Sequence, residues 1–195
     1  MTEITNIKVY DLKESVIASG NAMRIKPVEY TDDEFERGLA RMKKLVHSSY
    51  TSDVHCHDNA LTGIRVSFDI KYPQYLSTEL QRYHWIDIVT SSSKMHRLCQ
   101  MKLSECCNKY VAPEIIETVQ KYIDIYNAEP NYENFMRMVS NTPTGLELFM
   151  RVSTNYKQLQ TIYNQRRYHR LKEDWGAICD MIEQLPYFDI LIKKS

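Results

Sequence analysis

Arginine, histidine, lysine and serine are concentrated between Arg82 and Arg97, in a mixture suited to binding phosphate. The sixteen residues RYHWIDIVTSSSKMHR contain two arginines, two histidines, one lysine and three consecutive serines. Arginine and lysine carry fixed positive charges, and serine hydroxyls with backbone N–H groups complete the donors that a nucleotide phosphate needs. The segment is therefore a candidate ligand site, although a solvated helix end that runs into a polar loop would have a similar composition.

Composition limits the partners of the chain. Its 195 residues suit a single domain, 1–195, and its 25 basic residues balance its 25 acidic residues. A neutral chain does not favour nucleic acid or an anionic membrane, so any anion site must be local. No apolar run is long enough to span a bilayer, and the N-terminus lacks a signal-like pattern, so we expect a cytoplasmic protein. Five cysteines without paired spacing predict reduced, mostly buried thiols.

Periodic patterns predict the elements that must position the candidate site. The clearest is the strand at 64–72, IRVSFDIKY, in which apolar and polar residues alternate. Pro73 then suits the first turn of a helix from 74 to about 84, and the candidate site follows as a polar loop. Upstream, we expect a strand at 7–12, a helix at 14–24 and a second helix that begins at the capping box Thr31-x-x-Glu34.

From Pro113 onward the patterns predict mainly helices, at 113–128, 131–140, 145–168 and 170–184. The Asn141-Thr-Pro143 sequence marks a break between the second and third of these. The expected class is therefore α/β, in the sense of α+β, with a helical C-terminal half.

The candidate site resembles the signature RHRxxSxNExSxRY of the flavin-dependent thymidylate synthases, which also follows a strand and a helix. In an ungapped match, Arg82 falls on the first arginine, Ser92 on the last serine and Lys94 on the last arginine. His84 falls on the second arginine. Five further positions depart from the signature, namely Tyr83, Asp87, Val89, Thr90 and Met95.

Two further segments carry the same resemblance. Upstream, SSYTSDVHCHDNALTGIRVSFDI is similar to the family pattern GHxSxxEHxxFxF, with Ser52 and His57 at its serine and a histidine. Downstream, Arg137 precedes a proline break, and Asn155 and Arg166 are separated by eleven residues, as an asparagine and an arginine are in the family. On one helix these two residues would lie three turns apart on nearly the same face, where they could serve one pocket.

The resemblance implies a central, mainly antiparallel sheet flanked by helices, in a homotetramer whose active sites draw residues from more than one subunit. It implies an enzyme that binds FAD and transfers a one-carbon unit to dUMP or a related pyrimidine deoxynucleotide. Methylenetetrahydrofolate would supply the carbon and a reduced nicotinamide such as NADPH the hydride. The changes at Val89 and Thr90 leave the transferred group and the preferred pyrimidine open.

The resemblance also implies roles for individual residues. Ser92, Lys94 and Arg137 would bind the substrate phosphate, and Arg166 would face the pyrimidine, so that Ser92 and Arg166 are the candidate catalytic residues. The candidate FAD-binding residues are Arg82, His84, Asn155 and His169. Glu173 and Asp174 would add acidity near this pocket. We expect Arg166 to be exposed, so that Arg166→Ala abolishes binding or turnover and leaves the fold intact.

Alternative interpretations remain open at this point. A catalytically silent homologue could bind a nucleotide and act through a partner, and flavin absorbance of the purified protein would distinguish it from an enzyme. A zinc site could form from His47, His55, Cys56 and His57, although no second ligand cluster has the usual spacing, and we expect no metal. Cys106 and Cys107 lie in a helical pattern, where buried thiols are common, and the basic turn at 166–170 is weak support for nucleic-acid binding.

Overall fold

A computed structural model of the chain describes residues 1–48 and 57–193. In this part of the chain, four strands form one antiparallel sheet in the order β1-β2-β4-β3. The strands are β1 (Glu3–Tyr10), β2 (Arg65–Pro73), β3 (Asp87–Ser91) and β4 (Glu147–Asn155). The two central strands pair along their whole length, from Arg65 opposite Asn155 to Pro73 opposite Glu147. The expected antiparallel sheet flanked by helices is confirmed.

The alternation of residue types along β2 separates the two faces of the sheet. Val66, Phe68 and Ile70 are buried, whereas Ser67, Asp69 and Lys71 between them stay partly exposed. The same alternation buries Met150 and Val152 of β4 on the first face. We call the face that carries Asp69 and Lys71 the open face of the sheet.

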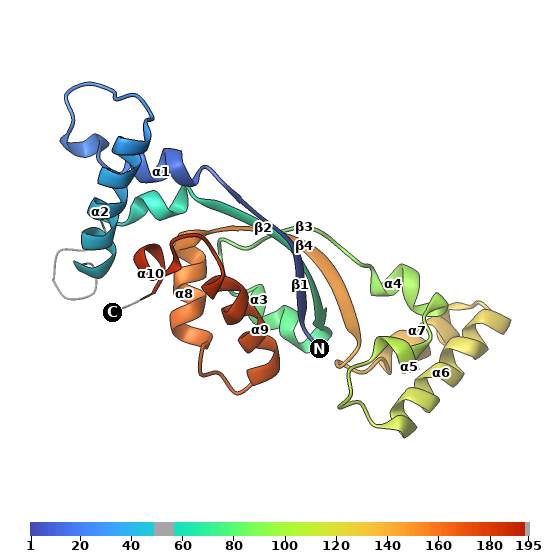
Figure 1. Cartoon of the computed structure of the whole chain (residues 1–195). Helices are drawn as coiled ribbons and strands as arrows, with labels where there is room; N and C mark the ends of the chain where they lie inside the picture. The colour runs from blue at the N-terminus through green and yellow to red at the C-terminus, as the bar shows by residue number, and fades with distance from the viewer. Residues whose placement is uncertain (49–56, 194–195) are drawn as a thin grey trace.

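Three helices lie together on one side of the sheet, away from the open face (Figure 1). They are α3 (Gln74–Leu80), α8 (Tyr156–Arg166) and α9 (Lys172–Glu183). Leu159, Ile162 and Ile178 from these helices meet Phe68 and Met150 of the sheet. Burial of these apolar side chains supplies the main driving force that holds the helices against the strands.

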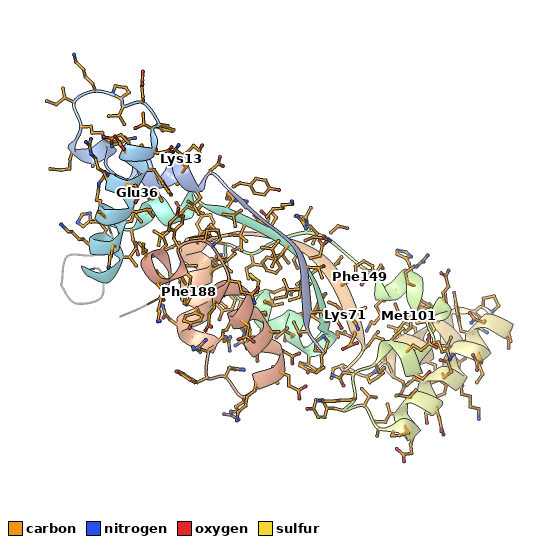
Figure 2. The ribbon with its side chains drawn as sticks, in the orientation of Figure 1. Lys13, Glu36, Lys71, Met101, Phe149 and Phe188 are labelled. Atoms are coloured by element: carbon orange, nitrogen blue, oxygen red, sulfur yellow. The ribbon has the colours of Figure 1, made fainter. Side chains whose placement is uncertain are left out.

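The other helices gather at the two ends of the sheet (Figures 1 and 2). One end carries α1 (Leu12–Ala18), η1 (Asn21–Met23), α2 (Asp32–Ser48), η2 (Asn59–Thr62) and α10 (Phe188–Leu191). The other end carries α4 (Lys94–Arg97), η3 (Leu98–Gln100), α5 (Leu103–Cys106), α6 (Pro113–Ala128) and α7 (Tyr132–Ser140). No helix among the described residues is long and apolar enough to cross a membrane.

Several predicted elements are confirmed with small changes in their bounds. The strand expected at 64–72 is β2, and the helix expected at 113–128 is α6. Half of the predicted capping box is present at the start of α2: the backbone N–H of Glu34 donates to Thr31 Oγ1 at 3.3 Å, whereas the Thr31 N–H donates to the Glu29 carbonyl and the Glu34 carboxylate accepts from Arg24 and Arg37. The helix expected at 14–24 is instead the short α1 followed by η1, and the strand expected at 7–12 begins earlier, at Glu3.

Two predictions for the sheet are wrong. The helix expected at 145–168 is strand β4 followed by α8, and the polar loop expected before the serines contains strand β3. In β4, Leu148, Met150 and Val152 are buried at every second position, a strand period that the helix-forming leucine and methionine obscured. The change to helix occurs at Asn155, whose side chain caps α8.

Candidate functional site

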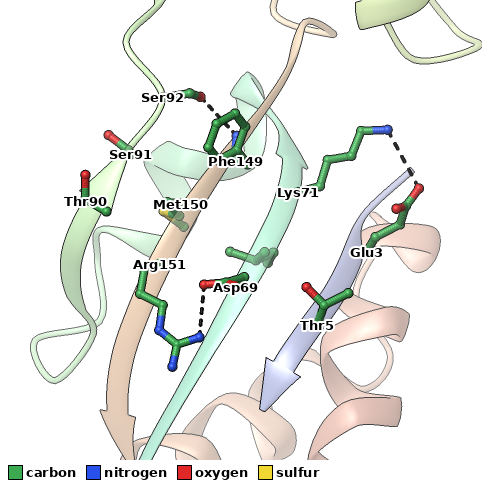
Figure 3. A pocket seen from close by; sticks show the side chains of 11 residues that line it. Glu3, Thr5, Asp69, Lys71, Thr90, Ser91, Ser92, Phe149, Met150 and Arg151 are labelled. Carbon is green, nitrogen blue, oxygen red and sulfur yellow. Dashed lines mark hydrogen bonds and ion pairs between the residues drawn. The ribbon is translucent and has the colours of Figure 1, made fainter. Parts of the chain in front are cut away.

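A cavity of about 490 Å³ lies on the open face of the sheet and is lined in part by the middle of the Arg82–Arg97 segment (Figure 3). Its lining comes from all four strands and includes Thr90, Ser91 and Ser92. The remaining lining residues are Glu3, Thr5, Asp69, Ile70, Lys71, Phe149, Met150 and Arg151. We call this cavity the sheet-face pocket. Its volume is in the range of sites for small molecules.

Backbone pairing sets the position of the serines in this pocket. The N–H of Ser92 donates to the Phe149 carbonyl at 2.8 Å, and Ser92 Oγ accepts from the Phe149 N–H at 3.1 Å. Ser92 therefore extends the pairing of β3 with β4 by one residue. Its hydroxyl hydrogen stays available to a ligand oxygen, because the hydroxyl is used only as an acceptor in this pair.

Polar bonds between strands hold the acidic and basic groups of the pocket. Asn6 lies at an irregularity in β1 with φ 52°, a left-handed conformation that asparagine tolerates, and its amide donates to Asp69 at 2.6 Å. Arg151 Nη1 donates to Asp69 at 3.0 Å and to the Asn6 carbonyl at 3.1 Å. The hydrogen bonds from Asn6 and Arg151 lower the pKa of the Asp69 carboxyl.

Lys71 is also paired, which leaves the pocket close to neutral. Its ammonium lies 2.9 Å from Glu147 and 3.7 Å from Glu3. The hydrogen bond to Glu147 raises the pKa of Lys71. Lys94, two residues after Ser92, is half-buried, and its ammonium makes no ion pair within residues 1–48 and 57–193. Lys94 does not itself line the sheet-face pocket, but it follows Ser92 by two residues in the chain and its ammonium can still pair with an anion.

Arg166 lies elsewhere, in the helical layer on the other side of the sheet. Its Nε donates to Tyr83 Oη at 2.7 Å, and its Nη1 lies 3.2 Å from Glu79 Oε2. The guanidinium carbon lies 4.7 Å from the centre of the Trp175 ring, a cation–π contact. Glu79, Tyr83, Arg166, His169 and Trp175 together form what we call the Arg166 cluster. Only 16% of the Arg166 side chain is exposed, so the expectation of an exposed arginine is wrong.

The other candidate cofactor residues lie near this cluster or along α8. Arg82 and His84 are exposed in the turn between α3 and β3. The turn contacts α8 through Tyr83 and through the Trp85 N–H, which donates to Gln158 Oε1 at 3.3 Å. His169 joins the cluster, with its ring centre 6.1 Å from that of Trp175.

Asn155 has a structural task at the start of α8. It is buried, and its side-chain oxygen accepts from the Gln158 N–H at 2.9 Å, as a helix N-cap does. Asn155 and Arg166 thus mark opposite ends of α8, about 16 Å apart at 1.5 Å per residue. The structure places these two residues apart and does not bring them into one pocket of a single chain.

Arg137, Glu173 and Asp174 each pair with side chains other than Arg166. Arg137 is exposed on α7 and pairs with Glu133 at 2.9 Å, one helical turn away. Glu173 accepts from Lys109 and Tyr110, and the buried Asp174 accepts from Thr2 and Tyr75. The carboxylate beside Arg166 is instead Glu79, which the sequence analysis missed. Ser52, His55 and Cys56 lie outside the described residues.

Sequence reasoning also missed three lining residues of the sheet-face pocket, namely Asp69, Lys71 and Arg151. All three alternate with buried residues along β2 and β4. The pattern of β2 did show which of its residues point away from the core. Arg151 was hidden by the helical prediction for 145–168.

The fold matches solved structures of flavin-dependent thymidylate synthase from Helicobacter pylori complexed with FAD and dUMP. One has a TM-score of 0.72 and 15% identity, and covers 98% of this chain and 100% of that chain. Another has a TM-score of 0.70 and 15% identity, with coverage of 99% and 98%. The UMP/dUMP methylase PolB from Streptomyces cacaoi, bound with 5-Br UMP, has a TM-score of 0.60 and 10% identity, with coverage of 94% and 86%.

No family model matches the sequence, and no curated protein matches it. At these low identities the structural matches establish the fold. The chain therefore has the fold of the flavin-dependent thymidylate synthases, as the resemblance in the sequence led us to expect.

Proposed function

We propose that the chain is a flavin-dependent methyltransferase that transfers a one-carbon unit to the pyrimidine of dUMP or a related nucleotide. The match in fold to proteins bound to FAD and dUMP, and to a UMP/dUMP methylase, supports this class of substrate. A fold alone does not specify a reaction. The residues of the sheet-face pocket and of the Arg166 cluster give further support for this reaction.

The observation that carries the proposal is the position of Ser92 in the sheet-face pocket. Ser92 matches the last serine of the family signature, and it lines a cavity with a hydroxyl that can donate. Thr90 and Ser91 add two more hydroxyls, and Lys94 follows as a cation without an ion pair among the described residues. Hydroxyls beside a cation form a suitable environment for the phosphate of a nucleotide.

The proposal requires an active site between subunits. The sheet-face pocket lies on the open face, whereas Arg166 lies in the helical layer on the other side of the same sheet. One chain therefore presents two separate half-sites. In a homotetramer, the Ser92 half-site of one subunit would meet the Arg166 half-site of its neighbour. Arg137 of α7 would bind the phosphate if it released Glu133 and paired with the phosphate instead.

Each half-site would have its own role. Ser92 and Lys94 would bind and orient the phosphate, and thereby place the pyrimidine ring. Arg166 would donate to a pyrimidine carbonyl where negative charge develops, with its remaining N–H groups. The position of its guanidinium is set before binding by Tyr83, Glu79 and Trp175, which favours such preorganised stabilisation.

The residues around the Arg166 cluster fit FAD in part. Arg82 and His84 are exposed and could donate to a pyrophosphate, and His169 is 24% exposed at its side chain. Asn155 fits less well, because its oxygen already caps α8 and only its amide NH₂ remains to donate. FAD, when bound, would supply the hydride chemistry, while methylenetetrahydrofolate and NADPH would be the expected co-substrates.

Three measurements test the proposal. The purified protein should show flavin absorbance or bind added FAD, and it should bind dUMP or UMP in equilibrium dialysis. Methyl transfer would then be assayed with methylenetetrahydrofolate and NADPH. Nucleotide binding with no flavin would instead favour the catalytically silent homologue, and the absence of both ligands would contradict the proposal.

Mixing two variants tests whether the site is shared between subunits. Ser92→Ala impairs one half-site and Arg82→Ala the other, and neither side chain is buried. If the site is shared, unfolding and refolding a mixture of the two impaired variants should recover part of the wild-type activity, measured at dUMP and FAD concentrations too low to saturate either variant, because some sites then combine two intact halves. A mixture that stays as inactive as its components would contradict a shared site.

A further inference from the structure

Glu79 is the central acceptor of the Arg166 cluster. Its Oε2 accepts from Trp175 Nε1 at 2.9 Å and lies 3.2 Å from Arg166 Nη1 and 3.8 Å from His169 Nε2. Trp175 is fully buried, so its indole N–H is an anchor with little freedom to move. The carboxylate is thus held by the core on one side and faces the guanidinium on the other.

His169 places a third nitrogen toward the same carboxylate, 3.8 Å away. Its Nδ1 accepts from the Leu171 N–H at 3.2 Å, so in the neutral ring the proton is on Nε2, which faces Glu79. Tyr83 completes the arrangement, because its hydroxyl accepts from Arg166 and donates to Gln165 Oε1 at 3.1 Å. Every polar neighbour of Arg166 is itself held by another group.

We propose that Glu79 is a positioning residue that orients the Arg166 guanidinium and offsets its charge, and so sets how tightly the site binds an anionic pyrimidine nucleotide. This inference rests on the proposed function for its ligand. A guanidinium has five N–H donors; Tyr83 accepts from one of them, and Glu79 forms an ion pair with Nη1 at 3.2 Å. The other donors keep a defined direction, because the guanidinium is planar and lies against Trp175.

The two effects of Glu79 can be separated by substitution. Glu79→Gln keeps an oxygen that can accept from Trp175 but removes the negative charge. An anionic ligand roughly 8 Å away should then bind about tenfold more tightly, given an effective dielectric constant of about 20 and further screening by salt. Glu79→Ala removes both the charge and the acceptor, so the orientation of Arg166 is lost as well.

The chain offers a matched control at Arg167, the residue directly after α8. Arg167 pairs with Glu183, and Tyr163 Oη donates to the same carboxylate at 2.8 Å. Arg167 also lies 5.0 Å from the Tyr163 ring centre. This second set of glutamate, arginine and tyrosine lies at the same end of α8, but we assign it no ligand. Glu183→Gln therefore removes one negative charge near the same end of α8 but leaves Glu79 and its contacts with Arg166 intact.

Tryptophan fluorescence provides a local measurement. The chain has two tryptophans, Trp85 and Trp175, so Trp85→Phe leaves Trp175 as the only tryptophan, which can be excited selectively at wavelengths that the fourteen tyrosines do not absorb. In this background we expect Glu79→Ala to shift the emission of Trp175 without any ligand, because the indole loses its acceptor, and Glu183→Gln to leave the emission unchanged. An unchanged spectrum for Glu79→Ala would overturn the orienting role, whether or not the protein binds nucleotides.

Titration with dUMP, and with UMP in parallel, then tests the effect on affinity. We expect Glu79→Gln to lower the dissociation constant and KM about tenfold with kcat within about threefold, and Glu79→Ala to lower kcat. Glu183→Gln should match the Trp85→Phe parent. Equal affinities in Glu79→Gln and the parent would overturn the charge-offsetting role, whereas a parent that binds neither nucleotide would overturn the proposed function and leave the fluorescence test of orientation intact.

Discussion

Replacing Arg166 with alanine should destabilise the protein as well as weaken nucleotide binding. The substitution removes a hydrogen bond to Tyr83 at 2.7 Å, an ion pair with Glu79 at 3.2 Å and a cation–π contact with Trp175 at 4.7 Å. The hydrogen bond contributes about 1 kcal/mol, the partly buried ion pair about 1–2 kcal/mol and the cation–π contact about 0.5–1 kcal/mol. Because these contributions are not strictly additive, we expect a loss of roughly 2–4 kcal/mol in the free energy of unfolding.

Thermal unfolding at a fixed protein concentration and without ligand measures this loss. For a chain of this length, each kcal/mol lowers the melting temperature by about 2–4 °C, so Arg166→Ala should lower it by roughly 4–16 °C. Arg167→Ala is the matched control, because the side chains of Arg167 and Glu183 are 38% and 34% exposed, and such a pair contributes at most about 1 kcal/mol. The cation–π contact of Arg167 with Tyr163 adds about 0.5 kcal/mol at this exposed site, so the control should lose less than Arg166→Ala. Equal melting temperatures for the two variants would refute the reasoning.

Three further changes test separate parts of the structure. Ser92→Ala removes the hydroxyl that lines the sheet-face pocket, and calorimetric titration should show dUMP affinity reduced about tenfold, whereas unchanged affinity would remove Ser92 from the site. Asn155→Ala removes the N-cap of α8 and should cost about 0.5–2 kcal/mol in urea unfolding, while Asn155→Asp, which can still cap, should cost less. Burial raises the pKa of the Cys107 and Cys179 thiols from 9.0 to about 11. The stability that these protonated thiols contribute is fully present below about pH 9 and is lost as the pH rises through 11, so urea midpoints that stay constant from pH 8 to 11 would contradict this assignment.

The elements that the sequence predicted well are those whose local pattern and tertiary environment agree. In β2 the alternation of residue types matches a strand with one face on the core, and in α6 Pro113 occupies the first turn that the pattern indicated. β4 failed because leucine and methionine also favour helices, so propensity competed with the two-residue period. Asn155 and Gln158 did carry the signal of a helix start, in the spacing of a capping box.

The residues of the candidate site that are close together in the sequence could be predicted, whereas contacts between residues far apart in the sequence could not. The Arg82–Arg97 segment could be recognised because its residues are neighbours in the chain, and its serines do line a cavity. Arg166 could be placed on a helix but not beside its partners, because Glu79 and Tyr83 are more than eighty residues away in the chain. The spacing of residues along one helix cannot predict contacts with side chains from another part of the chain.

The surroundings of Arg166 decide whether it can take the role that the family resemblance implies for it. A match in sequence transfers a side chain but not the groups around it, and those groups decide how much of its charge a ligand encounters. Arg166 faces a carboxylate that the core holds through Trp175, so its net field is weaker than that of an arginine without a counter-ion. If the proposed function is correct, Arg166 contributes to nucleotide binding more through the fixed direction of its N–H donors than through its net charge. Attraction of the phosphate would then depend on cations without such a counter-ion, of which Lys94 is the candidate nearest to Ser92 in the chain.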